Sequence, residues 1–385
     1  MRIVLMPSAY LPSLGGVEEL TRHLALELQA TGDQVEIWAP GPGVDPGATM
    51  EVLDGVTVRR FDMPLPRTDP LAVVRFGAGL PRTLWSMHTA WRRFRPYVVH
   101  VQCFGPNGAY ATALSRLTAT PLVASLQGET MMDDADIYDH SSTLRAALRA
   151  GLRRAAEVTA CSAFTLGDAE KRFGLPPGRG QVVFNGVDTD VAAPALPAAW
   201  SSRGPFVFAV GRLVDKKGFD LLIKAFAAVC DRHPDVGLVL AGAGRSESSL
   251  AHLIADLGLD ERVTLAGRLS REEVAAAMTA ATAFVMPSRL EPFGIVILEA
   301  WRAGTPVIAS SVGGAPEFVE DGRLGLVVDP HDTAALAGAL DRLLADPALR
   351  DELGRAGKRA VADFSWARIA GTYREVYGRA ASARP

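Results

Sequence analysis

The chain has 385 residues, of which 48% are apolar and 22% are charged, and its formal net charge is −3. These values lie near the globular average, so they exclude a disordered chain and a coiled coil. The balanced charge gives no reason to expect a nucleic-acid partner. The length predicts two domains, each long enough to bury a full core.

Three cysteines, Cys103, Cys161 and Cys230, lie far apart in the sequence. Their spacing fits neither a zinc site nor a disulfide framework, so we expect buried thiols in a reduced, cytoplasmic compartment and no metal centre. No apolar run approaches the roughly 18 residues of a membrane span. The first seven residues are too short for a signal-peptide core, and they are expected to form a strand.

Short β-branched runs alternate with amphipathic stretches along the whole chain, which predicts an α/β fold with parallel sheets and helical crossovers. In the first half the expected strands are residues 2–6, 34–38, 56–61, 97–101, 122–126, 157–161 and 181–184. In the second half they are residues 206–210, 237–241, 263–265, 283–286, 307–309 and 326–328. Each half is therefore expected to hold its own sheet.

A stretch rich in Pro and Ala, residues 189–197, has neither helical nor strand periodicity and is the best candidate for a linker. We therefore predict an N-terminal domain over residues 1–195 and a C-terminal domain over residues 200–364. A last helix is expected over residues 365–385. No strand follows it, so its sequence alone allows packing on either domain.

Within the first domain, residues 59–100 contain eight Arg against two Asp, together with Trp85 and Trp91. A basic amphipathic surface with tryptophans could dock on an anionic membrane or hold a phosphorylated acceptor. The chain has 35 Arg and only five Lys, however, so an Arg-rich stretch could equally be an ordinary solvated helix face.

Two of the five lysines, Lys216 and Lys217, stand next to each other in the loop after the first strand of the second domain. Arg212 precedes them in the same loop. Ligands in open parallel sheets bind outside the carboxyl ends of strands. Two or three cations on one such turn predict a diphosphate site, with a solvated basic turn as the alternative.

The segment 290–301 is expected to be a loop followed by a helix, because it fills one crossover between two strands. Glu299 then lies in the second turn of a largely apolar helix, where a carboxylate needs a partner. Glu291 lies just ahead of the helix, and the amides of Gly294, Ile295 and Val296 would attract an anion. Carboxylates beside an anion site suit a sugar nucleotide. Alternatively, Glu291 is solvated and Glu299 pairs with a nearby Arg.

Three glycine-rich loops, at residues 15–16, 241–244 and 313–314, would permit a close approach of the backbone to a ligand, or could equally be tight turns.

Together these motifs resemble the retaining glycosyltransferases of family four, which have the GT-B fold of two Rossmann-like, doubly wound domains facing a cleft. The second domain matches over most of residues 206–377, and the first matches more loosely. The matching positions are Gly15-Gly16, residues 98–101, residues 185–188, Gly211-Arg212, Lys217-Gly218, the pair Glu291 and Glu299, Phe293-Gly294, Gly313-Gly314, Glu317 and Phe364-Ser365-Trp366.

The resemblance implies a role for each matching residue. Arg212 and Lys217 would hold the diphosphate of a nucleotide sugar, Glu299 the ribose, and Arg268 with Leu269 the base. Glu291 and the backbone of Phe293, Gly294, Ile295 and Val296 would hold the donor sugar and β-phosphate, with Gly16 contributing from the first domain. The catalytic set would be Arg212, Lys217 and Glu291. The last helix would return to the first domain.

One position departs from the family, because many members have His where this chain has Gln127, followed by Gly128 and Glu129. Gln cannot act as a general base, although it can hydrogen-bond a sugar hydroxyl. The departure fits a retaining mechanism in which the leaving phosphate accepts the proton of the acceptor. Glu129, with Asp133 and Asp134, could bind a hydroxyl-rich or cationic acceptor, or could form an acidic solvated loop.

The leading hypothesis is therefore a metal-independent transferase that uses a nucleotide diphosphate sugar, preferably a uridine nucleotide, as co-substrate and no other cofactor. Its acceptor, a saccharide, a lipid-linked molecule or a small molecule, stays open. An epimerase or phosphorylase on the same fold and a non-catalytic nucleotide-sugar binding protein remain alternatives. A nicotinamide-dependent dehydrogenase is disfavoured, because no tight glycine fingerprint follows residues 2–6 and no acid ends the second strand.

Overall fold

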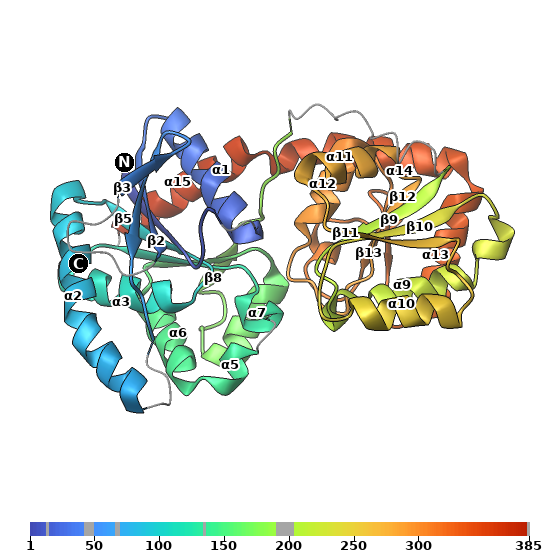
Figure 1. Cartoon of the computed structure of the whole chain (residues 1–385). Coiled ribbons are helices and arrows are strands. Elements are labelled where there is room, and N and C mark those ends of the chain that lie inside the picture. The colour runs from blue at the N-terminus through green and yellow to red at the C-terminus, as the bar shows by residue number, and fades with distance from the viewer. Residues whose placement is uncertain (13–14, 42–49, 66–69, 134–135, 190–203, 383–385) are drawn as a thin grey trace. The chain divides into compact units, whose positions relative to one another are not determined.

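The computed structural model describes residues 1–385 except 13–14, 42–49, 66–69, 134–135, 190–203 and 383–385. The described chain forms two compact units (Figure 1). The N-terminal unit comprises Met1–Asn185 together with Trp366–Pro385, and the C-terminal unit comprises Gly186–Ser365. Most of the expected linker falls outside the described residues.

The N-terminal unit is built on an eight-stranded sheet with the order β3-β4-β2-β1-β5-β6-β7-β8. Its pairs are parallel except for β3 with β4. The strands are β1 (Arg2–Pro7), β2 (Gln34–Pro40), β3 (Met50–Leu53), β4 (Val56–Phe61), β5 (Val98–Gln102), β6 (Leu122–Leu126), β7 (Glu157–Ala160) and β8 (Gly180–Val182). The helices are α1 (Gly16–Ala30), α2 (Pro70–Phe94), α3 (Pro106–Thr118), α4 (Glu129–Met132), α5 (Ile137–His140), α6 (Ser142–Arg154), α7 (Ala163–Phe173) and α15 (Trp366–Ser382).

The C-terminal unit is built on a parallel six-stranded sheet with the order β11-β10-β9-β12-β13-β14. Its strands are β9 (Phe206–Val210), β10 (Gly237–Ala241), β11 (Val263–Gly267), β12 (Ala283–Met286), β13 (Val307–Ser310) and β14 (Leu326–Val328). Its helices are α9 (Phe219–Ala227), α10 (Glu247–Asp256), α11 (Arg271–Ala280), α12 (Ile295–Ala303), α13 (Thr333–Ala345) and α14 (Pro347–Ala360), with short 3₁₀ turns that include η1 (Asp215–Lys217). The predicted α/β class is confirmed for both units.

Strand β3 is the element that the sequence prediction missed. It is four residues long, its side chains alternate between exposed and half-buried, and it pairs with β4 as an antiparallel hairpin. The turn between the two strands is Asp54-Gly55, and both residues have positive φ. An Asp-Gly pair flanked by runs with alternating apolar residues is a strong hairpin signal, so this strand could have been found from the sequence.

The last helix, α15, packs within the N-terminal unit, where it lies beside α1 (Figure 1). The indole of Trp366 stacks on the ring of His23, with centroids 5.2 Å apart. Further along, the hydroxyl of Tyr377 lies 2.7 Å from Nδ1 of His100, and Nε2 of His100 lies 2.6 Å from the hydroxyl of Ser125. Burial lowers the pKa of His100 to about 3, so this imidazole is neutral and serves to attach the helix to the sheet.

Among the helices that the structure describes, none combines the length and the apolar character needed to cross a bilayer.

Candidate functional site

The order of the C-terminal sheet places its switch point between β9 and β12, from which the chain runs outward in opposite directions. In open α/β sheets, ligands bind outside the carboxyl ends of the strands at such a point. The loop after β9 carries Arg212, Lys216 and Lys217, and the loop after β12 carries Glu291. The two motifs that the sequence analysis singled out therefore flank the switch point.

Lys217 and Glu291 form a close ion pair there, with Nζ 2.5 Å from Oε2. Both side chains are largely buried, at 18% and 10% exposed. The hydroxyl of Ser288 donates to the same carboxylate oxygen at 3.2 Å. A lysine ammonium group can donate three hydrogen bonds. One is donated to Glu291, and two remain for the oxygen atoms of a ligand. The site thus holds a positioned cation rather than a solvated basic turn.

The loops after β9 and β12 are tied together by Arg289, which the sequence analysis did not consider. Its backbone amide donates to the carbonyl of Lys216 at 2.9 Å. Its guanidinium binds both carboxylate oxygens of Asp220, in α9, at 2.7 Å. This bidentate pair lowers the pKa of Asp220 and fixes the loop that carries Glu291. No spacing signal marks Arg289, because its partners Lys216 and Asp220 are about 70 residues away. Ser288 binds Glu291 only three residues further on, and a serine at that spacing is not a distinctive pattern.

Close backbone contacts explain two of the glycine-rich loops. Gly313 has φ of +130°, and a Cβ there would lie 1.9 Å from the carbonyl oxygen of Glu291. Gly242 has φ of +137°, and its Cβ would lie 1.8 Å from the carbonyl oxygen of Gly211. Only glycine tolerates such crowding. These glycines let neighbouring loops pack at the carboxyl edge of the sheet, and the contact at Gly313 holds Glu291 in place.

Helix α12 begins at Ile295, after Gly294 in the left-handed conformation, as the loop-then-helix interpretation predicted. The amides of Ile295 and Val296 lie in its first turn, where backbone donors have no partner inside the helix. Phe293 is buried, and its ring lies 4.8 Å from that of Phe318. Glu299 lies in the second turn and is half-buried. Its helix otherwise buries apolar residues that include Ile297, Leu298 and Trp301.

The remaining sequence candidates of this unit lie on loops. Arg212 is exposed and follows β9. Arg268 is exposed and Leu269 is half-buried, and both follow β11. All three are therefore at the same edge of the sheet as the Lys217–Glu291 pair.

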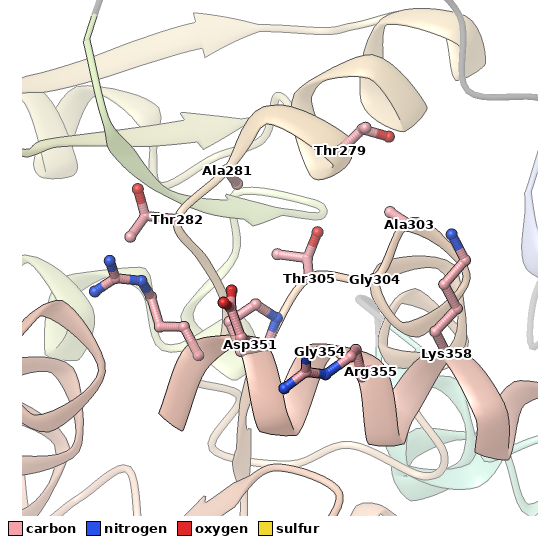
Figure 2. A pocket seen from close by; sticks show the side chains of 12 residues that line it. Thr279, Ala281, Thr282, Ala303, Gly304, Thr305, Asp351, Gly354, Arg355 and Lys358 are labelled. Carbon is pink, nitrogen blue, oxygen red and sulfur yellow. The ribbon is translucent and has the colours of Figure 1, made fainter. Parts of the chain in front are cut away.

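A cavity of about 530 Å³ lies at the opposite edge, before β12 and β13 (Figure 2). Two of the polar side chains that line it form hydrogen bonds with the ends of helices. Arg350 donates to the carbonyls of Leu343 and Leu344 in the last turn of α13. Thr305 donates to the carbonyl of Met278 in the last turn of α11. Cations and hydroxyls commonly complete helix C-termini in this way. Because the cavity lies at the opposite edge of the sheet, it is separate from the candidate site.

The switch point of the N-terminal sheet lies between β1 and β5. Gly15 caps α1 and Gly16 is its first residue, after the loop that follows β1. The loop after β5 begins with Cys103, a non-glycine residue at φ of +61°. That conformation is sparsely populated and costs roughly 1 kcal/mol or more. Burial and the nearby carboxylate of Glu129 raise the pKa of the Cys103 thiol.

Glu129, the first residue of α4, connects two of these loops. Its Oε1 accepts the amide of Phe104 at 2.6 Å, and its Oε2 accepts the amide of Gln127 at 2.7 Å. Burial raises the pKa of this carboxyl to about 7, although the amide hydrogen bonds oppose the shift. Glu129 is therefore not part of a solvated acidic loop. Asp133 accepts the amide of Ile137, and Asp134 lies outside the described residues.

Gln127 follows β6 and its side chain is half-buried. Its amide nitrogen Nε2 is inaccessible to solvent and has no hydrogen-bond partner within the described part of the chain. Gly128 has φ of +89° and caps α4. A buried donor without a partner costs free energy, and this makes Gln127 a candidate ligand-binding residue. The sequence had singled it out through a departure from the family pattern.

Among the described residues of the Arg-rich stretch 59–100, the arginines do not form one surface, while Arg67 lies outside the described residues. Arg59 pairs with Glu36, and Arg60 pairs with Glu51. The indole of Trp91 donates to Thr120 and is partly buried. Trp85 is 58% exposed. The second half of α2, which contains Trp85, also contains three exposed arginines, Arg82, Arg92 and Arg93.

The described residues contain no cluster of three His, Cys, Asp or Glu side chains that could hold a metal ion. What the C-terminal unit offers at its carboxyl edge is positive charge, buried carboxylate and free helix amides. This combination suits an anionic ligand that also carries hydroxyl groups.

The fold, two α/β domains with parallel-sheet cores, is that of the GT-B glycosyltransferases. Residues 14–191 match the family described as "Glycosyltransferase Family 4", and residues 197–360 match "Glycosyl transferases group 1". The chain belongs to the family 4 glycosyltransferases.

Particular relatives support this membership. A D-inositol 3-phosphate glycosyltransferase of Arthrobacter sp. (strain FB24) is 32% identical over 386 residues, covering 94% of this chain and 90% of the relative. An alpha-D-kanosaminyltransferase of Streptomyces kanamyceticus is 31% identical over 72% of this chain and 77% of its own length. In fold, the chain is similar to the Anabaena protein HepE, solved in complex with UDP, with a TM-score of 0.77 and 22% identity over 98% of this chain and 100% of HepE.

Proposed function

We propose that the protein transfers a sugar from a nucleotide diphosphate sugar to a hydroxyl acceptor with retention of anomeric configuration. The observation that carries the proposal is the largely buried Lys217–Glu291 pair beside the first turn of α12, at the switch point of the C-terminal sheet. It combines a cation for a leaving diphosphate with a carboxylate for sugar hydroxyls.

In the proposed reaction, the bond from the anomeric carbon to the β-phosphate oxygen breaks, and the acceptor oxygen forms its bond on the same face. The proton of the acceptor passes to an oxygen of the departing phosphate, so the products are the glycosylated acceptor and a nucleoside diphosphate. Arg212 and Lys217 stabilise the developing negative charge. The proposal includes no metal ion and no cofactor besides the donor, because these cations supply the charge.

The donor is assigned to the C-terminal unit. Glu299 would bind the ribose hydroxyls, and the loop with Arg268 and Leu269 would receive the base through its main chain. Glu291, with the backbone from Phe293 to Val296, would hold the sugar and the β-phosphate. We propose uridine as the base, a choice supported by the UDP complex of a protein with the same fold.

The acceptor is assigned to the N-terminal unit, where Gln127 offers a buried amide nitrogen and Gly128 and Glu129 shape the loop. Gly16, in the first turn of α1, is assigned to the binding of the sugar donor. The relatives act on different molecules, since one is named for D-inositol 3-phosphate and another for kanosaminyl transfer. The acceptor of this chain is therefore a hydroxyl-bearing saccharide, lipid-linked molecule or small molecule.

The donor assignment is tested by measuring the affinities of UDP, GDP, ADP and UDP-glucose by calorimetry for the wild type and for Glu299→Ala. Loss of two hydrogen bonds to the ribose should weaken binding by about 10- to 100-fold. Glu352→Ala removes an exposed carboxylate from α14 and serves as the matched control. Unchanged affinity in Glu299→Ala would remove its role, and binding of none of the four nucleotides would count against the proposal.

The stereochemistry and the alternatives are separated by following product formation by NMR. Retention with nucleotide release supports the proposed reaction. Phosphate-dependent turnover without a nucleotide would instead point to a phosphorylase, and conversion of the sugar without transfer would point to an epimerase. Tight nucleotide binding with no turnover on a broad acceptor panel would indicate a binding protein.

We also propose that the second half of α2 makes a peripheral contact with the anionic inner face of the membrane. Helix α2 contains no acidic residue, and Trp85 is exposed beside arginines of the same helix. An exposed tryptophan among cations is complementary to anionic lipid headgroups.

A further inference from the structure

The carboxylate of Glu129 links two loops at the carboxyl edge of the N-terminal sheet. One oxygen accepts the amide of Phe104, in the loop after β5, and the other accepts the amide of Gln127, in the loop after β6. The two hydrogen bonds, at 2.6 and 2.7 Å, are short and charge-assisted when the carboxyl group is ionised. Because both oxygens are occupied by amides, this side chain is better placed to hold the loops than to bind a substrate.

Each of the two linked loops contains a residue whose position depends on the conformation of the loop backbone. The ring of Phe104 is buried against Gly108 and Gly151, where an added Cβ would clash with it. The carbonyl of Phe104 accepts the hydroxyl of Tyr138. In the other loop, the side-chain nitrogen of Gln127 is buried without a partner in the described residues. The amide bond to Glu129 fixes the backbone from which that side chain projects.

The link depends on the ionisation of Glu129. A carboxylate accepts hydrogen bonds at both oxygens, whereas a carboxylic acid presents a hydroxyl proton at one of them and so loses one amide. The pKa of Glu129 is raised to about 7, chiefly by burial. The groups that face it are the Cys103 thiol after β5, the Tyr138 hydroxyl on α5 and the Asp168 carboxylate on α7. Burial keeps Cys103 and Tyr138 protonated, so Glu129 itself titrates near neutrality.

We propose that Glu129 is a positioning residue, which ties the loop after β5 to the loop after β6 and presents the Gln127 carboxamide to the substrate fully only when Glu129 is ionised. This inference rests on the proposed function for the identity of the substrate, but the tie between the loops does not. Activity that depends on Gln127 should accordingly be lost as the pH falls through about 7.

The tie is tested without any ligand by amide hydrogen exchange at pH 6 and pH 8, corrected for the intrinsic pH dependence of exchange. In the wild type, protection of one of the two amides, Phe104 or Gln127, should fall by about tenfold from pH 8 to pH 6, the cost of one charge-assisted hydrogen bond. Glu129→Gln should show low protection at both pH values. Glu157→Gln alters a carboxylate on β7 and should behave as the wild type.

Equal protection at the two pH values in the wild type would overturn the inference, and this arm requires no variant to fold. Equal protection in the wild type and Glu129→Gln at pH 8 would overturn it as well. Glu129→Asp keeps the charge but is one methylene shorter, so it should lose protection at one of the two amides while keeping the fold.

A kinetic measurement separates the inference from the proposed function. With UDP-glucose as donor, the KM for the acceptor should rise by about tenfold from pH 8 to pH 6 in the wild type, and this step should be absent in Glu129→Gln. If the exchange result appears but no nucleotide sugar supports turnover, the tie stands and the transferase proposal fails. If turnover is found with a pH-independent KM, the positioning role fails and the transferase stands.

Discussion

The switch points of the two units are built in different ways. At that of the C-terminal unit, charged side chains meet each other, as in the ion pair of Lys217 with Glu291 and the bidentate pair of Arg289 with Asp220. At that of the N-terminal unit, a carboxylate meets backbone amides, as in the bonds from Phe104 and Gln127 to Glu129. Paired charges create a preorganised site for one kind of ligand. In the N-terminal unit, one titratable carboxyl group binds the amides of two loops, so the proposed positioning role of Glu129 makes the shape of the site depend on pH. The side chains near these loops then determine which ligand binds.

The largest effect is expected from removing the cation of the C-terminal site, which tests whether that site depends on a positioned charge pair. Lys217→Ala should lower kcat/KM for the donor by about 10²- to 10³-fold, because the leaving charge loses a preorganised partner and Glu291 is left buried without its counter-ion. Lys216→Ala, in the same 3₁₀ turn, is the control and should cost less than tenfold. Steady-state kinetics with the active donor check both variants. Equal losses would mean that the turn acts by net charge rather than through a positioned pair.

Crowding of the backbone at the C-terminal site gives the next largest effect. Gly313→Ala would place a Cβ 1.9 Å from the carbonyl of Glu291, so the loop must move, and the free energy of unfolding should fall by roughly 2–4 kcal/mol. Gly338→Ala, in the open interior of α13, should instead raise it by about 0.5–1 kcal/mol. Urea unfolding measures both. A Gly313→Ala protein as stable as the wild type would contradict the packing argument.

The N-terminal site should show its titratable tie as a pH dependence of stability. Because the folded-state pKa of Glu129 is raised to about 7 from 4.5, the native state holds a proton that the unfolded state has lost between these pH values. Stability contributed at this position is therefore lost as the pH rises from about 4.5 to 7, by roughly 2–3 kcal/mol, and changes no further above 7.

Urea unfolding at pH 5 and pH 8 checks this sign. The wild type should lose stability relative to Glu129→Gln between the two pH values, because Gln cannot titrate. A wild type that gains stability relative to Glu129→Gln over the same interval would mean that the carboxyl group is not buried enough for its pKa to rise.

The smallest expected effect concerns the surface of α2, which has no counterpart among the features assigned to the C-terminal unit. Trp85→Ala combined with Arg92→Gln should weaken binding to vesicles containing anionic lipid by about tenfold or more, since one basic residue contributes about 1 kcal/mol at such a surface. Arg359→Gln, an exposed arginine of α14, is the matched control. Sedimentation with vesicles measures the binding. No difference between the variants, or no binding by the wild type, would leave α2 as a solvated helix.

Much of the C-terminal site could be predicted from the sequence, because its residues lie in short segments directly after strands. Residues 211–218 follow β9 and residues 287–299 follow β12, and the alternation of strands and helices brings such loops to one edge. The contacts inside the site could not be predicted. The partners of Glu291 are Lys217, 74 positions away, and Ser288, and spacing alone does not distinguish a paired from a solvated carboxylate.

Less of the N-terminal site could be predicted. Gln127 was found through its departure from a family pattern, but its missing partner is visible only in the fold. The sequence allowed an acidic solvated loop around Glu129, whereas its carboxylate is enclosed by two amides from different loops. Likewise, Arg59 and Arg60 are strand residues with acidic partners, whereas Arg82, Arg92 and Arg93 are exposed helix residues, a division that depends on which face each one occupies.

The sequence by itself determined the α/β class, the order along the chain of all strands except β3, and the family, because periodicity and motif spacing are local properties. The family resemblance implied that the last helix returns to the first domain. Only the tertiary structure decided how α15 is held within the N-terminal unit, where Tyr377 meets a buried, neutral His100. It also decided the environment of the scarce lysines. Lys217 is a largely buried partner of Glu291 rather than one charge of a solvated turn, because burial and pairing arise from segments that are distant in the sequence.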